Sequence, residues 1–167
     1  MGTYLCRDES PYPLTGATHP TRAHAKLLSE LLFGAHGEFT MINEFLYSEL
    51  ILSKEKAALA DLFDCIALVD LRHFQMLSTI LKQCGADPKY RTVRGTHTDW
   101  WSGRSLSYPT TPANSLDLLC QYKRATIADY TNAIQHCNDD GIARLLLRIR
   151  ADELCHLDLL SSVTEEV

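Results

Sequence analysis

Hydrophobic residues recur every three or four positions along four stretches of the chain, and this spacing predicts four amphipathic helices. We expect the helices at about residues 22–53, 55–84, 115–137 and 140–163. Residues 86–114 show no helical period and contain several turn formers. A connection of this length is unusual unless it has a topological role. In a helical bundle it can cross over, so that the second and third helices run parallel.

The pattern therefore predicts an all-α fold, an antiparallel four-helix bundle with a long crossover between the second and third helices. Residues 1–21 are rich in proline, glycine and threonine and predict an extended N-terminal arm, which leaves residues 22–167 for the bundle. The chain has 167 residues and a dispersed net charge of −5, which argues against a nucleic-acid partner. No apolar run is long enough for a membrane span, and the first ten residues contain no apolar signal core. We therefore expect no membrane partner and a cytoplasmic location.

The cysteines show no CxxC spacing and are not clustered, which argues against an iron–sulfur site. We interpret all six as reduced, mostly buried thiols. They are Cys6, Cys65, Cys84, Cys120, Cys137 and Cys155.

Two pairs of a carboxylate and a histidine interrupt the apolar stripes of the second and fourth predicted helices. Asp70 precedes His73 by three residues, and Glu153 precedes His156 by three residues. Residues at this spacing share one face of a helix, so both side chains of a pair can point at one spot. Glu38 lies inside the stripe of the first helix. A four-helix bundle builds a carboxylate metal centre from such pairs, so these five residues are candidate ligands.

The two halves of the chain look like copies of each other. Residues 38–45 align with 123–130, and residues 70–77 align with 153–160. The step between the aligned segments is 32 residues in the first half and 30 in the second. Internal repetition of this kind predicts two helical hairpins packed about a pseudo-twofold axis. The alignment places Lys123 in the position that corresponds to Glu38.

With these motifs, the stretch 85–91 and the pair Trp100-Trp101, the sequence resembles the ferritin-like superfamily, the di-metal carboxylate bundles that include rubrerythrin, bacterioferritin and manganese catalase. The resemblance covers about residues 12–162 and extends to small bacterial relatives of a spore-coat protein. The family pattern is a Glu, an ExxH pair, a second Glu and a second ExxH pair. The resemblance implies iron or manganese, with five metal ligands in this chain: Glu38, Asp70, His73, Glu153 and His156.

The chain departs from the family pattern at two positions. Asp70 stands where the first pair normally has a Glu, and Lys123 stands where the third helix normally supplies a Glu ligand. A protonated lysine cannot coordinate a metal and repels a cation. We expect an inward Lys123 that pairs with Glu153, Glu38 or Asp70 and substitutes for the second metal, so that one ion per chain is favoured over two. The alternative is that Lys123 turns toward solvent and a water replaces the missing ligand.

The resemblance implies a ferritin-like metalloprotein, an oxidoreductase acting on oxygen or peroxide at a degenerate mono- or dinuclear site, in a homo-oligomer such as a dimer. Lys123 and Tyr130 are the candidate catalytic residues. A tyrosine beside a di-metal centre can relay electrons, whereas a core tyrosine often only donates one hydrogen bond. The alternative is a non-catalytic structural or assembly protein, for example one associated with the spore coat, whose metal site has decayed into a metal-free salt-bridged core.

Overall fold

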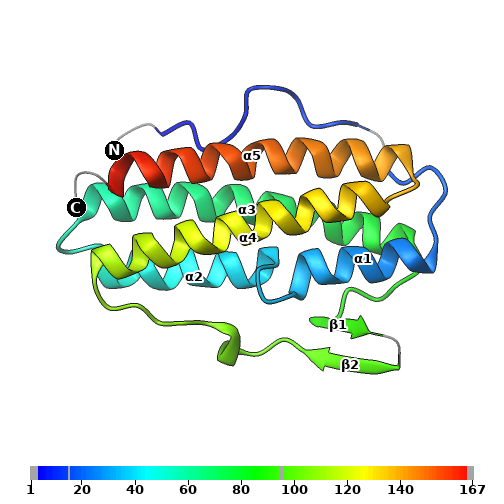
Figure 1. The fold of residues 1–167 in the computed structure, drawn as a ribbon, viewed down its shortest axis with the longest axis horizontal. Coiled ribbons are helices and arrows are strands. Elements are labelled where there is room, and N and C mark those ends of the chain that lie inside the picture. The colour runs from blue at the N-terminus through cyan, green and yellow to red at the C-terminus, as the bar shows by residue number, and fades with distance from the viewer. Residues whose placement is uncertain (1–3, 15, 95, 165–167) are drawn as a thin grey trace.

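The described part of the chain, residues 4–14, 16–94 and 96–164 of a computed structural model, forms a helical bundle (Figure 1). Two helices, α1 and α2, follow one another along one side of the bundle and together take the place of a single long helix. Three further long helices complete the bundle. The bounds are α1 Arg22–Phe33, α2 Glu38–Leu52, α3 Ala57–Gln83, α4 Pro112–His136 and α5 Asp140–Thr164.

The helices pair as two antiparallel hairpins, α2 with α3 and α4 with α5. The chain then returns along the outside of the bundle between α3 and α4, so that these two helices run in the same direction (Figure 1). The all-α bundle and its crossover are thus confirmed. Within the described residues, every helix is too short or too polar to span a bilayer.

The prediction of one continuous helix over residues 22–53 is wrong, because the helix is interrupted between Phe33 and Glu38. Gly37 is the N-cap of α2, and a Cβ atom built on it would lie 2.8 Å from the backbone of Leu32. The chain therefore folds tightly here only because Gly37 has no side chain. The interruption makes Glu38 the first residue of α2, where the positive end of the helix dipole favours a carboxylate.

The crossover contains a short hairpin that the sequence analysis did not predict. Strand β1 spans Arg91–Arg94 and pairs antiparallel with β2, His97–Trp100, and a 3₁₀ turn, η1, follows at Gly103–Ser105. The Nε1 atom of Trp101 donates to Thr40 Oγ1 at 2.9 Å, which holds the crossover on α2. Helix α4 begins at Pro112, earlier than predicted, because Thr111 caps it and proline suits the first turn.

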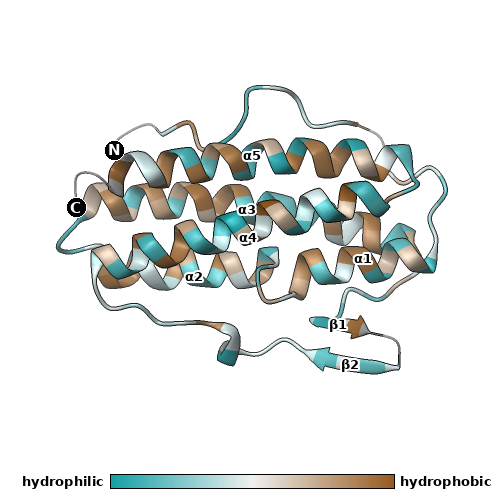
Figure 2. Cartoon of the chain, viewed as in Figure 1, coloured by the Kyte–Doolittle hydropathy of each residue, from teal (hydrophilic) through white to brown (hydrophobic). Residues whose placement is uncertain are grey.

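Two hydrophobic clusters fill the two ends of the bundle and leave a polar layer between them. One cluster includes Leu28, Leu81 and Leu146, and the other includes Phe45 and Leu160. Along each helix, hydrophobic and hydrophilic residues alternate (Figure 2). The polar residues that interrupt the stripes are buried in this middle layer, between the two clusters.

The N-terminal segment runs without helix or strand along α5 (Figure 1). Arg148 of α5 holds it through Nε, which donates to the carbonyl of Ser10 at 2.6 Å, and through Nη2, which donates to the carbonyl of Asp8 at 2.8 Å. The segment then reaches α3, where Cys6 and Cys65 form a disulfide.

The prediction that all six cysteines are reduced is therefore wrong for two of them. The folded arm brings the Cα atoms of Cys6 and Cys65 to 6.1 Å, although 59 residues separate them in the chain. That distance lies within the usual range for a disulfide. Spacing along the sequence does not reveal such a pair, because the path of the arm decides it. The other four cysteines are free.

Candidate metal centre

A cluster of carboxylates and a histidine lies in the polar layer at the centre of the bundle. Glu38 comes from α2, Asp70 and His73 from α3, and Glu153 from α5, and all four are 0–1% exposed. One potential ligand atom from each residue lies within 4.8 Å of the other three. The fold thus brings together four of the five predicted ligands.

Lys123 of α4 points into this cluster and is fully buried. Its Nζ atom lies 2.8 and 2.9 Å from the two carboxylate oxygens of Asp70 and 2.7 Å from Oε2 of Glu153. Burial alone would lower the pKa of Lys123, but the charges of Asp70 and Glu153 raise it above its usual range, so the side chain is an ammonium. The inward alternative is therefore the one that the structure adopts.

His73 is held from outside the cluster by a carboxylate that the sequence analysis did not single out. Its Nε2 atom lies 2.9 Å from Oδ2 of Asp152, and its Nδ1 atom lies 3.3 Å from Glu153 and 3.6 Å from Glu38. Burial would lower the pKa of His73, but the charge of Glu38 and these contacts raise it well above its usual range. In the metal-free protein His73 is therefore an imidazolium.

His156 lies on the other side of Glu153 in a different environment. Its Nε2 atom donates to the carbonyl oxygen of Cys6 at 2.7 Å, and its Nδ1 atom lies 3.4 Å from Asp70 and 3.7 Å from Glu153. Burial and the nearby charge of Lys123 lower the pKa of His156, so the ring is neutral. With the proton on Nε2, its Nδ1 lone pair faces the cluster. His156 is the fifth predicted ligand, and it lies at the edge of the group of four.

Four buried atoms that face the cluster have no hydrogen-bond partner among the described residues. Two are carboxylate oxygens and two are ring nitrogens, the donor types that iron and manganese accept in proteins. Both histidines use their outward nitrogen for a hydrogen bond and turn the inward nitrogen toward the carboxylates of the cluster, as metal-binding histidines do. The residues present therefore fit one ion. The four atoms are Glu38 Oε2, His73 Nδ1, Glu153 Oε1 and His156 Nδ1.

The charges in the cluster also fit one divalent ion. Burial raises the pKa of Asp70 well above its usual range, and the ammonium of Lys123 opposes this effect. Without a metal, three carboxylates, those of Glu38, Asp70 and Glu153, face two cations, Lys123 and His73. A divalent ion that displaced the proton of His73 would make the cluster neutral.

Tyr130 contacts the predicted centre through Glu38. Its hydroxyl donates to Glu38 Oε1, and its side chain is fully buried. Burial and the charge of Glu38 raise the pKa of Tyr130 well above its usual range, so the phenol keeps its proton. Tyr122, also in α4, instead hydrogen-bonds Ser107 of the crossover at 2.7 Å and lies toward the outside of the bundle.

Sequence reasoning missed the residues that support the histidines from outside. Asp152 accepts a hydrogen bond from the hydroxyl of Tyr12 at 2.6 Å as well as from His73. It also forms an ion pair with Arg148, which lies one helical turn earlier in α5. Burial opposes ionisation of Asp152, but these hydrogen bonds lower its pKa to about 2. The i, i+4 spacing of Arg148 and Asp152 was the available signal in the sequence. Nothing in the sequence indicated that Tyr12 reaches α5.

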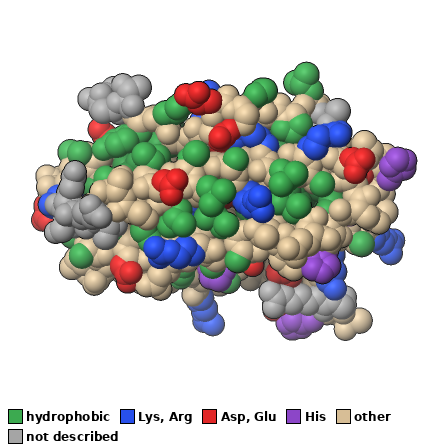
Figure 3. Space-filling view, turned by 45° about the horizontal axis from the view of Figure 1, so that its top comes forward, with side chains coloured by type: hydrophobic (Ala, Val, Ile, Leu, Met, Phe, Trp, Pro, Cys, Tyr) green, Lys and Arg blue, Asp and Glu red, His purple; other side chains and the backbone are tan. Residues whose placement is uncertain are grey.

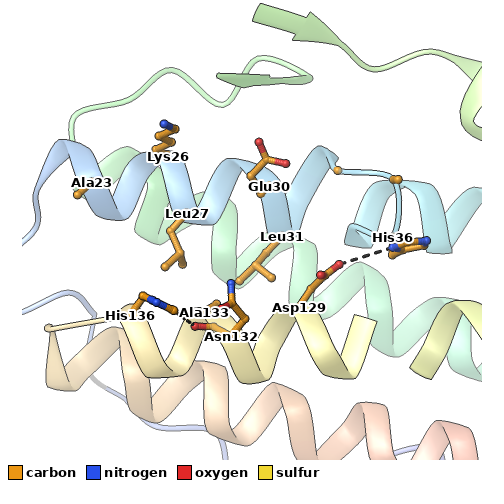
Figure 4. A pocket seen from close by; sticks show the side chains of 12 residues that line it. Ala23, Lys26, Leu27, Glu30, Leu31, His36, Asp129, Asn132, Ala133 and His136 are labelled. Carbon is orange, nitrogen blue, oxygen red and sulfur yellow. Dashed lines mark hydrogen bonds and ion pairs between the residues drawn. The ribbon is translucent and has the colours of Figure 1, made fainter. Parts of the chain in front are cut away.

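A groove of about 770 Å³ lies between α1 and α4 (Figure 4). Leu27 and Leu31 point into it from α1, while Asp129 at its edge lies 3.6 Å from His36. None of the predicted ligands lines this groove, nor do Lys123 and Tyr130. It is therefore separate from the buried cluster.

Comparison with known proteins places the fold. Crystal structures of KatB, a manganese catalase from Anabaena PCC7120, match with a TM-score of 0.83 at 16% sequence identity, over 95% of this chain and 78% of that one. A bacterioferritin from Desulfovibrio desulfuricans matches with a TM-score of 0.74 at 19% identity, over 87% of this chain and 80% of that one. The sequence itself matches no protein-family model and no curated protein. The ferritin-like fold expected from the sequence is thus confirmed.

Proposed function

We propose that this bundle binds one divalent iron or manganese ion per chain and acts as an oxidoreductase on oxygen or peroxide. The observation that carries the proposal is the buried group of Glu38, Asp70, His73 and Glu153, each of which places one potential ligand atom within 4.8 Å of the other three in the middle of the bundle. The manganese catalase and the bacterioferritin with the same fold support the choice of metal and reaction class. When bound, the ion would supply the change of oxidation state.

The residues of the chain would divide the work as follows. Glu38, His73 and Glu153 bind the ion, with Asp70 beside them. Lys123 takes the place of a second ion, since its ammonium neutralises Asp70 and Glu153 where the family pattern has another metal. The full burial of these groups excludes bulk water and strengthens every charge interaction inside the cluster.

Tyr130 and His156 would act at the edges of the centre. Tyr130 keeps its phenolic proton and donates it to Glu38, so it can orient that carboxylate and return a proton to it. Neutral His156 turns its free Nδ1 lone pair toward the cluster, 3.4 Å from Asp70 Oδ1, so it can bind the ion from the edge of the group of four.

The second candidate is a non-catalytic structural or assembly protein, of the spore-coat-associated kind. The ion pairs of Lys123 with Asp70 and Glu153 favour it, because they already compensate two of the buried carboxylates without a metal. In that case the cluster is a salt-bridged core, and it predicts no bound metal, no reaction with peroxide and tolerance of the paired change His73→Ala with His156→Ala.

Elemental analysis separates the two candidates. Native protein and Lys123→Glu are loaded anaerobically with iron and with manganese, desalted and analysed for metals per chain, with Glu38→Gln as the control for adventitious binding. We expect about one ion in the native protein, about two in Lys123→Glu and fewer than either in Glu38→Gln. Peroxide consumption by the loaded native protein then tests the reaction. Absence of metal from the native protein would leave the structural bundle as the better account.

We also propose that the protein is a cytoplasmic homo-oligomer, such as a dimer. Hydrophobic side chains gather between charged ones on one face of the molecule (Figure 3). Exposed leucines on α3 and α5, among them Leu68 and Leu154, would suit a contact between copies. Light scattering of the purified protein tests the oligomeric state.

A further inference from the structure

The outward nitrogens of both histidines are held by the N-terminal segment. His156 Nε2 donates directly to the carbonyl oxygen of Cys6. His73 Nε2 bonds to Asp152, whose carboxylate also receives the backbone N–H of Asp8 at 2.7 Å and the hydroxyl of Tyr12. The contacts that set the orientation of each ring therefore run through residues 6–12, which we call the strap.

The strap has two separate fastenings. Residues 8–12 are held by Arg148, which donates to the carbonyls of Asp8 and Ser10 and lies 4.3 Å from the ring centroid of Tyr12. The end that contacts His156 is held to α3 by the covalent bond between Cys6 and Cys65, and next to it the hydroxyl of Tyr4 donates to the carbonyl of Ala58 at 3.4 Å. The hydrogen bonds of Arg148 do not respond to a reductant, whereas the disulfide can be broken by reduction.

The disulfide is placed where a small reductant can reach it. A hollow of about 760 Å³ on the surface beside α3 is lined by both cysteines and by Arg7, Tyr12 and Arg72. Cys65 is partly exposed, while Cys6 is buried at 3%. A thiol entering the hollow would therefore meet Cys65 first.

We propose that the Cys6–Cys65 disulfide is a redox site for dithiol reductants, and that its state controls the access of solvent to His156. While it is intact, the carbonyl of Cys6 covers His156 Nε2. When it is reduced, residues 4–7 lose their covalent tie to α3 and uncover His156, and Arg148 keeps residues 8–12 and the support of His73 in place. The effect on metal binding rests on the proposed function, whereas the uncovering of His156 does not.

The exchange is a two-electron reduction. One thiolate of the dithiol attacks Sγ of Cys65, the Cys65–Cys6 bond breaks, and Cys6 leaves as a thiolate that takes up a proton. The second thiolate of the reductant attacks the sulfur of the reductant in the mixed disulfide. This step releases Cys65 as a thiolate, which takes up a proton in turn. The protein gains two electrons and two protons, and the dithiol becomes a disulfide.

Chemical modification of the histidines tests the proposal without any metal. Metal-free protein, oxidised or reduced with dithiothreitol, is treated with diethyl pyrocarbonate, which acylates accessible neutral imidazole nitrogens, and each histidine is followed by mass spectrometry. We expect the modification rate of His156 to rise at least about tenfold on reduction. His73 should stay protected in both states, and the exposed His97 and His136 should react equally in both.

Cysteine variants give the matched comparison. Cys6→Ser and Cys65→Ser should behave like reduced protein whether or not dithiothreitol is present, while Cys137→Ser should behave like the native chain. Circular dichroism checks that each variant is folded, and two independent variants guard against the loss of one. Equal protection of His156 in oxidised protein, reduced protein and both variants would overturn the proposal. So would a disulfide that resists dithiothreitol in the folded protein.

The same samples then show whether the site and the proposed function are linked. If the protein binds iron or manganese, reduction should weaken the affinity, because His156 loses the hydrogen bond that orients it. If it binds neither metal, the proposed function is wrong, but the modification rates of His156 still test whether reduction of the disulfide uncovers that residue.

Discussion

The ammonium of Lys123 contacts both carboxylate oxygens of Asp70, at 2.9 and 2.8 Å, inside a core where neither residue is exposed to solvent. In the ferritin-like pattern the residue at position 70 is a carboxylate that faces metal, and here it faces an amine. Helix α4 thus supplies a cation where the ferritin-like pattern expects a carboxylate. On the other side of the cluster, Glu38 and His73 match that pattern.

Removal of the Lys123 charge should destabilise the metal-free protein. In Lys123→Met the buried Asp70 and Glu153 lose their common cation, and breaking a buried pair from one side costs about 3–5 kcal/mol. The free energy of unfolding, from urea titration monitored by circular dichroism, measures this cost. Lys54→Met removes an exposed lysine and should change stability by less than about 0.5 kcal/mol. Equal stability of the two variants would show that the ion pairs of Lys123 contribute little.

Metal binding should become tighter as the pH rises, because the ion must displace protons. The pKa of His73 is raised in the metal-free protein, so below that pKa a proton on His73 competes with the ion. In that range the affinity should rise up to about tenfold per pH unit. Calorimetry in buffers of different ionisation enthalpy counts the protons released. A release of zero protons would contradict the charge balance described above.

The fold could be predicted from the sequence because the apolar period, the internal repeat and the long crossover all point to one topology. The helix break at Gly37 was missed, because an interruption of about one turn hardly changes the spacing of hydrophobic residues over about thirty positions. The hairpin at 91–100 was missed because its strands are short and mostly exposed, so they show no buried alternation.

The meeting of the carboxylates and histidines in one cluster could be predicted because i, i+3 spacing fixes which side chains share a helix face. The inward position of Lys123 and its three possible partners could be expected from the sequence, but which of the three it contacts depended on how the helices meet. The support of His156 by the Cys6 carbonyl could not be predicted, because a backbone oxygen in an arm without periodic structure has no signature in the sequence. The disulfide at the same residue was mispredicted for the same reason.

Tyr130 should stabilise the protein through Glu38. In Tyr130→Phe the carboxylate of Glu38 loses the hydrogen bond that the Tyr130 hydroxyl donates to it. An unsatisfied buried acceptor costs about 1–3 kcal/mol. Tyr90→Phe is the matched control, since Tyr90 is 47% exposed and its ring contacts remain. Thermal unfolding of the metal-free variants compares the two. A Tyr130→Phe protein as stable as Tyr90→Phe would mean that Glu38 finds another partner.

Asp139, at the start of α5, should make the free energy of unfolding fall in acid. Its Oδ1 accepts the N–H groups of Gly141 and Ile142 at 2.9 Å, and its Oδ2 accepts those of Thr18 and His19. Burial opposes ionisation, but these bonds lower the pKa of Asp139 to about 2. Since the folded pKa lies below the unfolded value of 3.8, the stabilisation is complete above about pH 4 and is lost as the pH falls toward 2.

The change Asp139→Ala should therefore cost about 2–4 kcal/mol at pH 7, because it removes a helix cap and leaves backbone donors of the arm without an acceptor. The difference in the free energy of unfolding between this variant and the native protein should become steadily smaller from pH 4 to pH 2. Asp140→Ala is the matched control, because Asp140 is exposed and its carboxylate lies in the first turn of α5, where its interaction with the helix dipole is worth about 0.3–1 kcal/mol. Urea titrations of all three proteins at several pH values give the comparison. A gap that stayed constant down to pH 2 would show that Asp139 acts through its shape and not through its charge.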